Sequence, residues 1–204
     1  MLKIFLCEPI HPRALALLKT RAEVFSDPAC LGRADAAISR NLRMDAAFLE
    51  QCPALKVIGI HGTGTDRVDL AAAAQRGVRV VYAPGENAQS VAELIVVLTL
   101  ALARRVYLAD RMLQTGEALA IADARLTGME LHGKTLGLVG VGSIARCAAE
   151  MFRRAFGMSI VGYSPSLTEE RAACLGIARC TCTRGICPGG RWSISVPSRP
   201  DAGL

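Results

Sequence analysis

A glycine-rich stretch in the second half of the chain carries the clearest chemical signal. A short apolar run precedes Gly140, Gly142 and Ala145, which form the pattern G-x-G-x-x-A, and helical spacing follows. Gly140 permits a tight turn, Gly142 lets a pyrophosphate approach the backbone, and Ala145 keeps the helix close to the strand. Backbone N–H groups at Ser143 and Ile144 would face the phosphates. The predicted chemistry is dinucleotide binding, and an ordinary glycine-rich turn is the alternative.

Histidine and cysteine, the other residue types that could do chemistry, form weaker patterns. His61 has no obvious carboxylate nearby in sequence to orient it, which argues against an acid/base role. Four of the eight cysteines crowd together as C-x5-C-x-C-x4-C, without a C-x2-C pair or a nearby histidine. We therefore expect no metal site and keep a zinc site as the alternative. The four are Cys174, Cys180, Cys182 and Cys187.

Composition and charge exclude several classes of protein. Of the 204 residues, 51% are hydrophobic and 4% aromatic, which favours α/β layers. Half of the net charge of +6 lies in residues 174–204, where four arginines face one aspartate. The other arginines are scattered, so we expect a solvated basic surface and no nucleic-acid partner. No apolar run approaches the roughly 18 residues of a membrane span. The early acidic residue argues against a signal peptide, so we expect a cytoplasmic location.

Apolar runs that alternate with helical patterns predict parallel sheets with helices on both faces. One long helix is expected over 90–113; its broad apolar content would suit a place between two domains. Shorter helices are expected over 12–19, 45–51, 68–76 and 168–175, and Asp45 is expected to be the N-cap of the second of these. Strands are expected over 2–6, 22–25, 36–39, 56–60, 78–82, 135–139, 158–163 and 192–197.

Four stretches make the chain resemble the D-isomer-specific 2-hydroxyacid dehydrogenases. Residues 62–69 are similar to the family's G-x-G-x-D-x-V-D loop, and residues 83–93 to its TPG-x-N-x-x-x-V-A-E segment. Residues 130–137 run into the glycine-rich fingerprint, and residues 195–197 are similar to the family's H-V-P. Together these motifs are far more specific than any one of them.

The resemblance implies an α/β fold of two domains. Residues 1–95 would be a flavodoxin-like substrate domain, and residues 96–130 a linking helix and connector. Residues 131–204 would be a partial, truncated Rossmann domain that binds NAD or NADP. Family members commonly dimerise through the cofactor domain and the connector beside it, so a homodimer is the expected assembly.

The resemblance also implies a reaction, the transfer of hydride between a nicotinamide and a small 2-hydroxy or 2-keto acid. The backbone at Thr63 and Gly64 would bind the substrate carboxylate, although Thr63 could equally belong to a simple turn. Val91 would lie near the nicotinamide, and Val196 and Pro197 would contact the cofactor.

The family's catalytic Arg, Glu and His have no counterparts in this sequence, because they lie beyond the point matched by Pro197. We therefore assign no catalytic residue and expect the chain alone to be inactive. The alternative is a non-catalytic dinucleotide-binding or protein-interaction module.

Ser164 stands where the family usually has an aspartate that binds the adenine ribose. A carboxylate would repel a 2′-phosphate and serine would not, so NADP is expected to be tolerated. Ser166, Thr168 and Arg171 are close enough in sequence to contact that phosphate. A Ser164 that contacts neither cofactor is the alternative.

The tail has an unusual composition. Residues 178–191 mix arginine, cysteine, glycine and proline without periodicity, and a strand-like pattern returns after Trp192. A displaced reading frame that shifts again before an early stop would produce this sequence, which is a hypothesis that resequencing the coding DNA would test.

Overall fold

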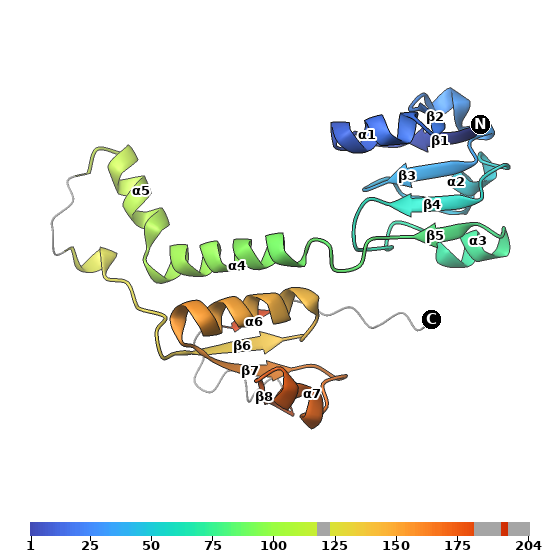
Figure 1. Ribbon diagram of the computed structural model, residues 1–204. Helices are drawn as coiled ribbons and strands as arrows, with labels where there is room; N and C mark the ends of the chain where they lie inside the picture. Colours follow the sequence, from blue (N-terminus) through green and yellow to red (C-terminus); the bar gives the residue numbers. More distant parts are fainter. Residues whose placement is uncertain (118–122, 182–192, 196–204) are drawn as a thin grey trace. The chain divides into compact units, whose positions relative to one another are not determined.

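The computed structural model describes residues 1–117 and 123–181, together with the backbone of residues 193–195. It divides into two compact units, Met1–Asn87 and Ala88–Leu204. Each unit contains its own parallel β-sheet with helices packed against it (Figure 1). The predicted α/β fold class is therefore confirmed.

The first unit has a five-stranded sheet in the order β2-β1-β3-β4-β5, and all neighbouring strands are parallel. This is the flavodoxin-like order, which the family resemblance predicted. The strands are β1 (Leu2–Leu6), β2 (Ala22–Phe25), β3 (Ala36–Ser39), β4 (Val57–Ile60) and β5 (Arg79–Val81). The helices are α1 (Pro12–Lys19), η1 (Pro28–Arg33), α2 (Ala46–Glu50) and α3 (Leu70–Gln75).

Aspartates begin the two short helices α2 and α3. An Asp45 carboxylate oxygen accepts a hydrogen bond from the backbone N–H of Phe48 at 3.1 Å, and Asp69 accepts one from Ala72 at 2.9 Å. Each side chain satisfies a donor that the first helical turn leaves without an intrahelical partner. The sequence-based prediction of Asp45 as a helix cap is confirmed.

The second unit has a four-stranded parallel sheet in the order β8-β7-β6-β9. In chain order this is 3-2-1-4, the first four strands of the doubly wound dinucleotide-binding sheet. The strands are β6 (Thr135–Val139), β7 (Ser159–Tyr163), β8 (Ala178–Arg179) and β9 (Ser193–Ser195). The helices are α4 (Ala88–Ala103), α5 (Val106–Gln114), η2 (Ala124–Leu126), α6 (Ser143–Phe156) and α7 (Glu169–Cys174).

Helix α6 connects the core of this unit to α4. Phe152 of α6 is fully buried, and Ala92 of α4 belongs to the same apolar cluster. The two helices lie side by side (Figure 1). Helix α4 therefore belongs to the second compact unit, which begins at Ala88.

The prediction of one helix over 90–113 is wrong, because α4 and α5 are separate helices. The chain breaks at Arg105, whose φ of 53° is left-handed. The Ala103 carbonyl accepts a hydrogen bond from Met129 at 2.8 Å, and the Arg105 side chain donates to the Thr127 carbonyl at 2.9 Å. A returning segment more than twenty residues away therefore contacts the end of α4, which a local apolar pattern does not reveal.

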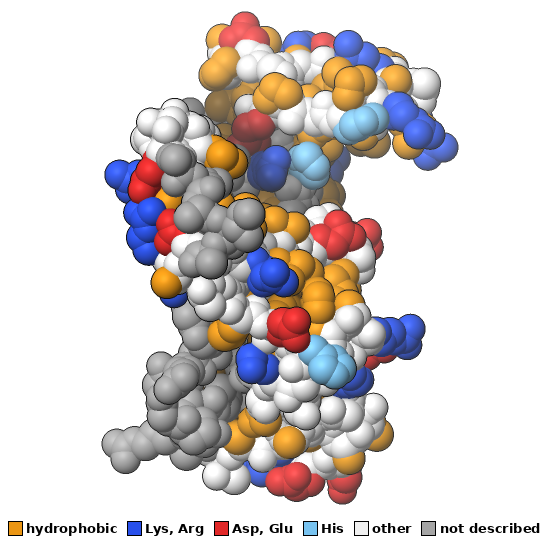
Figure 2. Space-filling model, turned by 90° about the vertical axis from the view of Figure 1, so that its left-hand side faces the viewer, with side chains coloured by type: hydrophobic (Ala, Val, Ile, Leu, Met, Phe, Trp, Pro, Cys, Tyr) orange, Lys and Arg blue, Asp and Glu red, His pale blue; other side chains and the backbone are white. Residues whose placement is uncertain are grey.

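The two sides of α4 are both apolar, which explains its unusual composition. One side packs on the core through Ala92, Ile95 and Val96. The other side is exposed and continues onto α5. Its members are Leu94, Val97, Leu98 and Leu102 of α4 and Val106, Tyr107 and Leu113 of α5, which we call the α4–α5 apolar stripe. Figure 2 shows one face of the molecule, on which hydrophobic side chains gather between charged ones.

Within the described part of the chain, every helix is too short or too polar to cross a lipid bilayer.

Candidate functional site

The turn from β6 to α6 is built around Gly140. Its φ of 92° lies in the region that favours glycine, because a side chain there would be strained. Its N–H donates a hydrogen bond of 2.7 Å to the carbonyl of Tyr163. The turn is thus fixed to the end of the neighbouring strand β7, as a tight strand-to-helix connection requires.

Gly142 has a different reason to be glycine. Its φ of −77° and ψ of −173° are extended backbone that any residue can adopt. A Cβ added there would meet no atom of the described residues within 4 Å. Among these residues, neither the backbone conformation nor the packing therefore requires glycine at this position. The missing side chain instead leaves open space beside the start of α6.

The start of α6 faces that space with hydrogen-bond donors. Gly142 is the N-cap and offers no side chain to the first-turn N–H groups, which begin at Ser143 and Ile144. Such groups lack intrahelical partners and carry the positive end of the helix dipole. Ala145 is 2% exposed and packs in the core, so the helix can approach the sheet closely. The arrangement fits an anion such as a pyrophosphate.

Ser164 lies directly after β7, next to the residue whose carbonyl holds Gly140. It is 7% exposed, and its hydroxyl lies 3.2 Å from the hydroxyl of Ser166. Thr168 accepts a hydrogen bond from the backbone N–H of Arg171 at 3.2 Å and so begins α7. The position at the end of β7 is therefore occupied by a pair of neutral hydroxyl groups.

The remaining predicted site residues are distributed as follows. Val91 is half-buried on α4, near Gln89, whose side-chain oxygen accepts a hydrogen bond from the thiol of Cys147 on α6 at 3.1 Å. Val196 and Pro197 lie outside the described residues. The structure therefore brings five predicted residues together around one turn: Gly140, Gly142, Ser143, Ile144 and Ser164.

Thr63 and Gly64 belong to the other unit, in the loop that follows β4. Both are half-buried, whereas His61 at the start of the loop is exposed. The loop is attached to its neighbours by two backbone hydrogen bonds, from His61 to the Ser39 carbonyl at 2.8 Å and from Ala83 to the Gly62 carbonyl at 2.9 Å. The loop therefore lies at the carboxyl edge of the first sheet, where open α/β sheets bind ligands.

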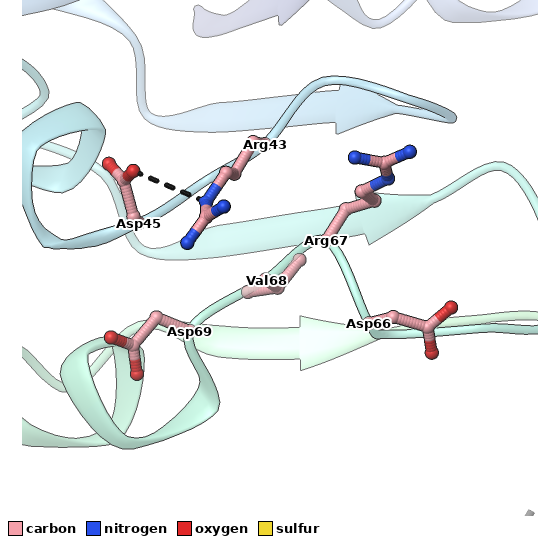
Figure 3. A pocket seen from close by; sticks show the side chains of 6 residues that line it. All are labelled: Arg43, Asp45, Asp66, Arg67, Val68 and Asp69. Carbon is pink, nitrogen blue, oxygen red and sulfur yellow. Dashed lines mark ion pairs between the residues drawn. The ribbon is translucent and has the colours of Figure 1, made fainter.

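A polar cavity of about 300 Å³ lies elsewhere in the first unit (Figure 3). Arg43 forms an ion pair of 3.5 Å with Asp45 in its wall. Asp45 and Asp69 also begin helices α2 and α3, so their carboxylates have a structural role. The cavity is lined by Arg43, Asp45, Asp66, Arg67, Val68 and Asp69.

The cysteines in the described ranges do not suggest a reactive or metal-binding site. Burial, and secondarily the charge of Glu8, raises the pKa of the Cys7 thiol to about 12, so it stays protonated near neutral pH. Among the described residues, no cluster of three histidine, cysteine or acidic side chains could hold a metal ion. Cys182 and Cys187 fall outside those residues, so the alternative of a zinc site stays untested.

Glu8 makes contacts that the sequence analysis did not identify. Its carboxylate accepts hydrogen bonds from three consecutive backbone N–H groups, at Arg40 (2.9 Å), Asn41 (2.7 Å) and Leu42 (2.9 Å). Partial burial would raise the pKa of Glu8, but these three donors outweigh it and hold the pKa below its ordinary value. No local pattern could have signalled a contact across 32 residues.

The chain is similar to one protein family over most of its length. A family model described as D-isomer specific 2-hydroxyacid dehydrogenase, catalytic domain, matches residues 4–184. The D-3-phosphoglycerate dehydrogenase of Methanocaldococcus jannaschii is 34% identical over 210 residues, which cover 98% of this chain and 39% of that protein. The chain thus spans well under half the length of this relative.

Two solved structures are similar along 98% of the chain. The TT0316 protein of Thermus thermophilus is 28% identical, with a TM-score of 0.86 over 66% of its own chain. A Polaromonas protein provisionally assigned as an NAD-binding D-isomer specific 2-hydroxyacid dehydrogenase is 26% identical, with a TM-score of 0.85 over 66% of its chain. These findings confirm the resemblance that the motifs indicated.

Proposed function

Because the chain belongs to the D-isomer-specific 2-hydroxyacid dehydrogenase family, we propose that it binds NAD or NADP as part of an oxidoreductase. The reaction interconverts a small 2-hydroxy acid and a 2-keto acid. The observation that carries the proposal is the open space at Gly142, where no atom of the described part of the chain requires glycine. A pyrophosphate explains why that space is kept free.

Each residue of the turn has a separate part in this proposal. Gly140 sets the path of the backbone, and Gly142 leaves room for the pyrophosphate beside it. Ser143 and Ile144 donate their backbone N–H groups to the phosphate oxygens. Bound at this turn, the nicotinamide dinucleotide supplies the hydride that converts a 2-keto acid to a 2-hydroxy acid.

Further residues in each unit have proposed roles. In the second unit, the family resemblance assigns Val91 a place near the nicotinamide, and it assigns contacts with the cofactor to Val196 and Pro197, which lie outside the described residues. On the substrate side, the backbone N–H groups of Thr63 and Gly64 bind the carboxylate of the 2-keto acid. Their loop is fixed at its start by the His61–Ser39 hydrogen bond of 2.8 Å, which supports a positioning role for it.

The substitution Gly142→Ser tests nucleotide binding without disturbing the fold. Serine is a favourable N-cap and fits the extended backbone there, so we expect unfolding stability to be unchanged or slightly higher. The added side chain fills the space for the pyrophosphate, so NADH and NADPH affinity should fall at least about tenfold. Nucleotide fluorescence titration and urea unfolding measure the two effects.

Gly140→Ala is the comparison variant, because it should affect folding stability, which Gly142→Ser should not lower. At a φ of 92° an alanine is strained, so this substitution should lower the free energy of unfolding by about 1–3 kcal/mol. Unimpaired nucleotide binding by well-folded Gly142→Ser protein would contradict the proposed site.

Ser164 supports NADP as an accepted cofactor, because its hydroxyl and that of Ser166 place no negative charge at the end of β7. Ser164→Asp should weaken NADPH binding at least about tenfold more than NADH binding, since a carboxylate repels the 2′-phosphate. Ser164→Asn is the neutral control of similar size. A preference of the unaltered chain for NADH of tenfold or more, measured by the same titration, would refute this part of the proposal.

Catalysis by this chain alone is a separate question from cofactor binding. The test is the oxidation of NADH and NADPH with glyoxylate, hydroxypyruvate or pyruvate, followed by absorbance. Turnover would show that the chain is itself the enzyme. Its absence, with binding retained, would favour the alternative of a dinucleotide-binding or protein-interaction module.

We also propose that the chain forms a homodimer through the α4–α5 apolar stripe. Leu94, Leu98 and Leu102 are each at least 45% exposed and recur every fourth residue along one side of α4. An apolar surface of this regularity is typical of an interface between protein chains. The opposite side of the helix already packs against its own unit, so this stripe is available to a second copy.

Leu98→Glu should convert such a dimer to a monomer, because it places a charge in the centre of the buried stripe. Sedimentation velocity measures the mass of the particle. Leu17→Glu is the control, since Leu17 is also an exposed leucine (61%, against 45% for Leu98) but lies on helix α1, away from the stripe. A monomeric unaltered chain, or a dimer that survives Leu98→Glu, would contradict the proposal.

A further inference from the structure

The turn after β3 contains a backbone arrangement that binds an anion. The N–H groups of Arg40, Asn41 and Leu42 converge on the Glu8 carboxylate at 2.7–2.9 Å. Successive N–H groups that point into one concavity form an anion-binding nest. Hydrogen bonds to a charged acceptor are roughly twice as strong as neutral ones. The chain therefore fills this nest with its own carboxylate.

The nest lies at a special position in the sheet. Glu8 follows β1 by two residues, and the turn follows β3, which pairs with β1. In the order β2-β1-β3, the direction of strand succession reverses between β1 and β3. Open α/β sheets bind ligands at this reversal, outside the carboxyl ends of the strands. In this chain the same place holds an internal contact between two strand ends.

The segment that carries the nest is attached at both ends to the loop after β4. At its start, the Ser39 carbonyl accepts a hydrogen bond from His61 at 2.8 Å. At its end, Met44 donates to the Arg67 carbonyl at 2.7 Å and accepts from Asp69 at 2.9 Å. Residues 39–44 and 61–69 are therefore joined as one ladder. The side chains of Ser39 and Met44, at the two ends of the first segment, are also buried.

Packing does not fix the middle of that segment. The side chains of residues 40–43 are all exposed, and Leu42 is 40% exposed. Besides Glu8, the Ser39 hydroxyl accepts one further hydrogen bond from Leu42 at 3.1 Å. Polar contacts with Glu8 and Ser39 thus hold the turn, and Glu8 supplies three of these four hydrogen bonds.

We propose that Glu8 is a positioning residue for the loop that carries Thr63 and Gly64. It acts by filling the nest at Arg40, Asn41 and Leu42, which fixes the adjoining ladder to residues 61–69. This inference rests on the proposed substrate role of that loop and adds a residue to it. No contact of Glu8 with Thr63 or Gly64 is proposed. Its effect on their loop passes through the backbone of the turn at Arg40, Asn41 and Leu42.

Amide hydrogen exchange, followed by NMR on the full chain, tests the proposal. In Glu8→Gln, which keeps the size of the side chain, exchange at Asn41 and Leu42 should accelerate at least about tenfold, since charge-assisted bonds are lost. Exchange at His61 and Met44 should accelerate as well. Asp27→Asn is the matched control, because the Asp27 carboxylate accepts from Ala29 at 3.0 Å in the same unit and should alter neither set.

Three outcomes would overturn the proposal. The first is acceleration confined to the nest, with His61 and Met44 unchanged, because the effect would then not reach the loop. The second is equal acceleration across the whole first unit, which would indicate general destabilisation. The third needs no variant: unprotected Asn41 and Leu42 amides in the unaltered chain would show that the nest is not held.

Rescue by a small carboxylate distinguishes the nest from simple packing. In Glu8→Ala, sodium formate should restore the protection of Asn41 and Leu42, and sodium chloride at the same ionic strength should not. Restoration by both salts or by neither would contradict the anion-binding role.

Substrate binding is measured by NMR on the same protein samples. Glyoxylate should shift the amide resonances of Thr63 and Gly64, and Glu8→Gln should raise its dissociation constant at least about threefold without changing NADPH affinity. An unchanged constant would refute the positioning role. Failure of the unaltered chain to bind NADPH would instead refute the proposed function, and the exchange results would still decide the role of Glu8 in the first unit.

Discussion

The hydrogen bond from the Gly140 N–H to the Tyr163 carbonyl, 2.7 Å long, is the constraint on which the second unit depends. It fixes the end of β6 to the end of β7 while the left-handed backbone of Gly140 turns the chain into α6. The direction of α6 then determines where its free N–H groups point and how Phe152 fills the core. Two residues further on, Gly142 leaves open space beside the start of α6. The two glycines therefore differ: Gly140 is required by the backbone conformation of the turn, and Gly142 is not.

Unpaired backbone donors also determine the contacts at the carboxyl edge of the first sheet. Strand ends in a parallel sheet present unpaired backbone donors, and these are satisfied by ligands, by water or by other parts of the protein. Glu8 satisfies three of them with one carboxylate. The adjoining loop around Thr63 is fixed by the backbone ladder from Ser39 to Asp69. Backbone hydrogen bonds organise this edge together with the buried side chains of Ser39, Met44 and Val68.

Several features could be predicted from the sequence because their causes are local. Asp45 is followed by a short apolar helix, and apolar runs of four or five residues defined most strands, including Thr135–Val139. The glycine pattern identified the turn because backbone conformation depends on the residue itself. Family motifs then indicated a flavodoxin-like and a Rossmann-type fold, and the observed strand orders agree with these two folds.

Other features depend on distant contacts and could not be predicted. The break at Arg105 follows from the bond between Met129 and Ala103, so the helical pattern over 90–113 was misleading. Glu8 is an ordinary acidic residue in the sequence, and its partners lie 32–34 positions away. The short strand β8 was missed because two residues show no periodicity. Local chemistry thus predicted the cofactor turn better than the connections around it.

The central claim is that the open space at Gly142 receives the pyrophosphate of a nicotinamide dinucleotide. The most direct measurement is an NMR titration of the unaltered chain with NADPH, in which amide shifts are followed residue by residue. The account predicts saturable shifts that are largest at Gly142, Ser143 and Ile144. A folded chain whose shifts at these three residues stay unchanged at millimolar NADPH and NADH would contradict it.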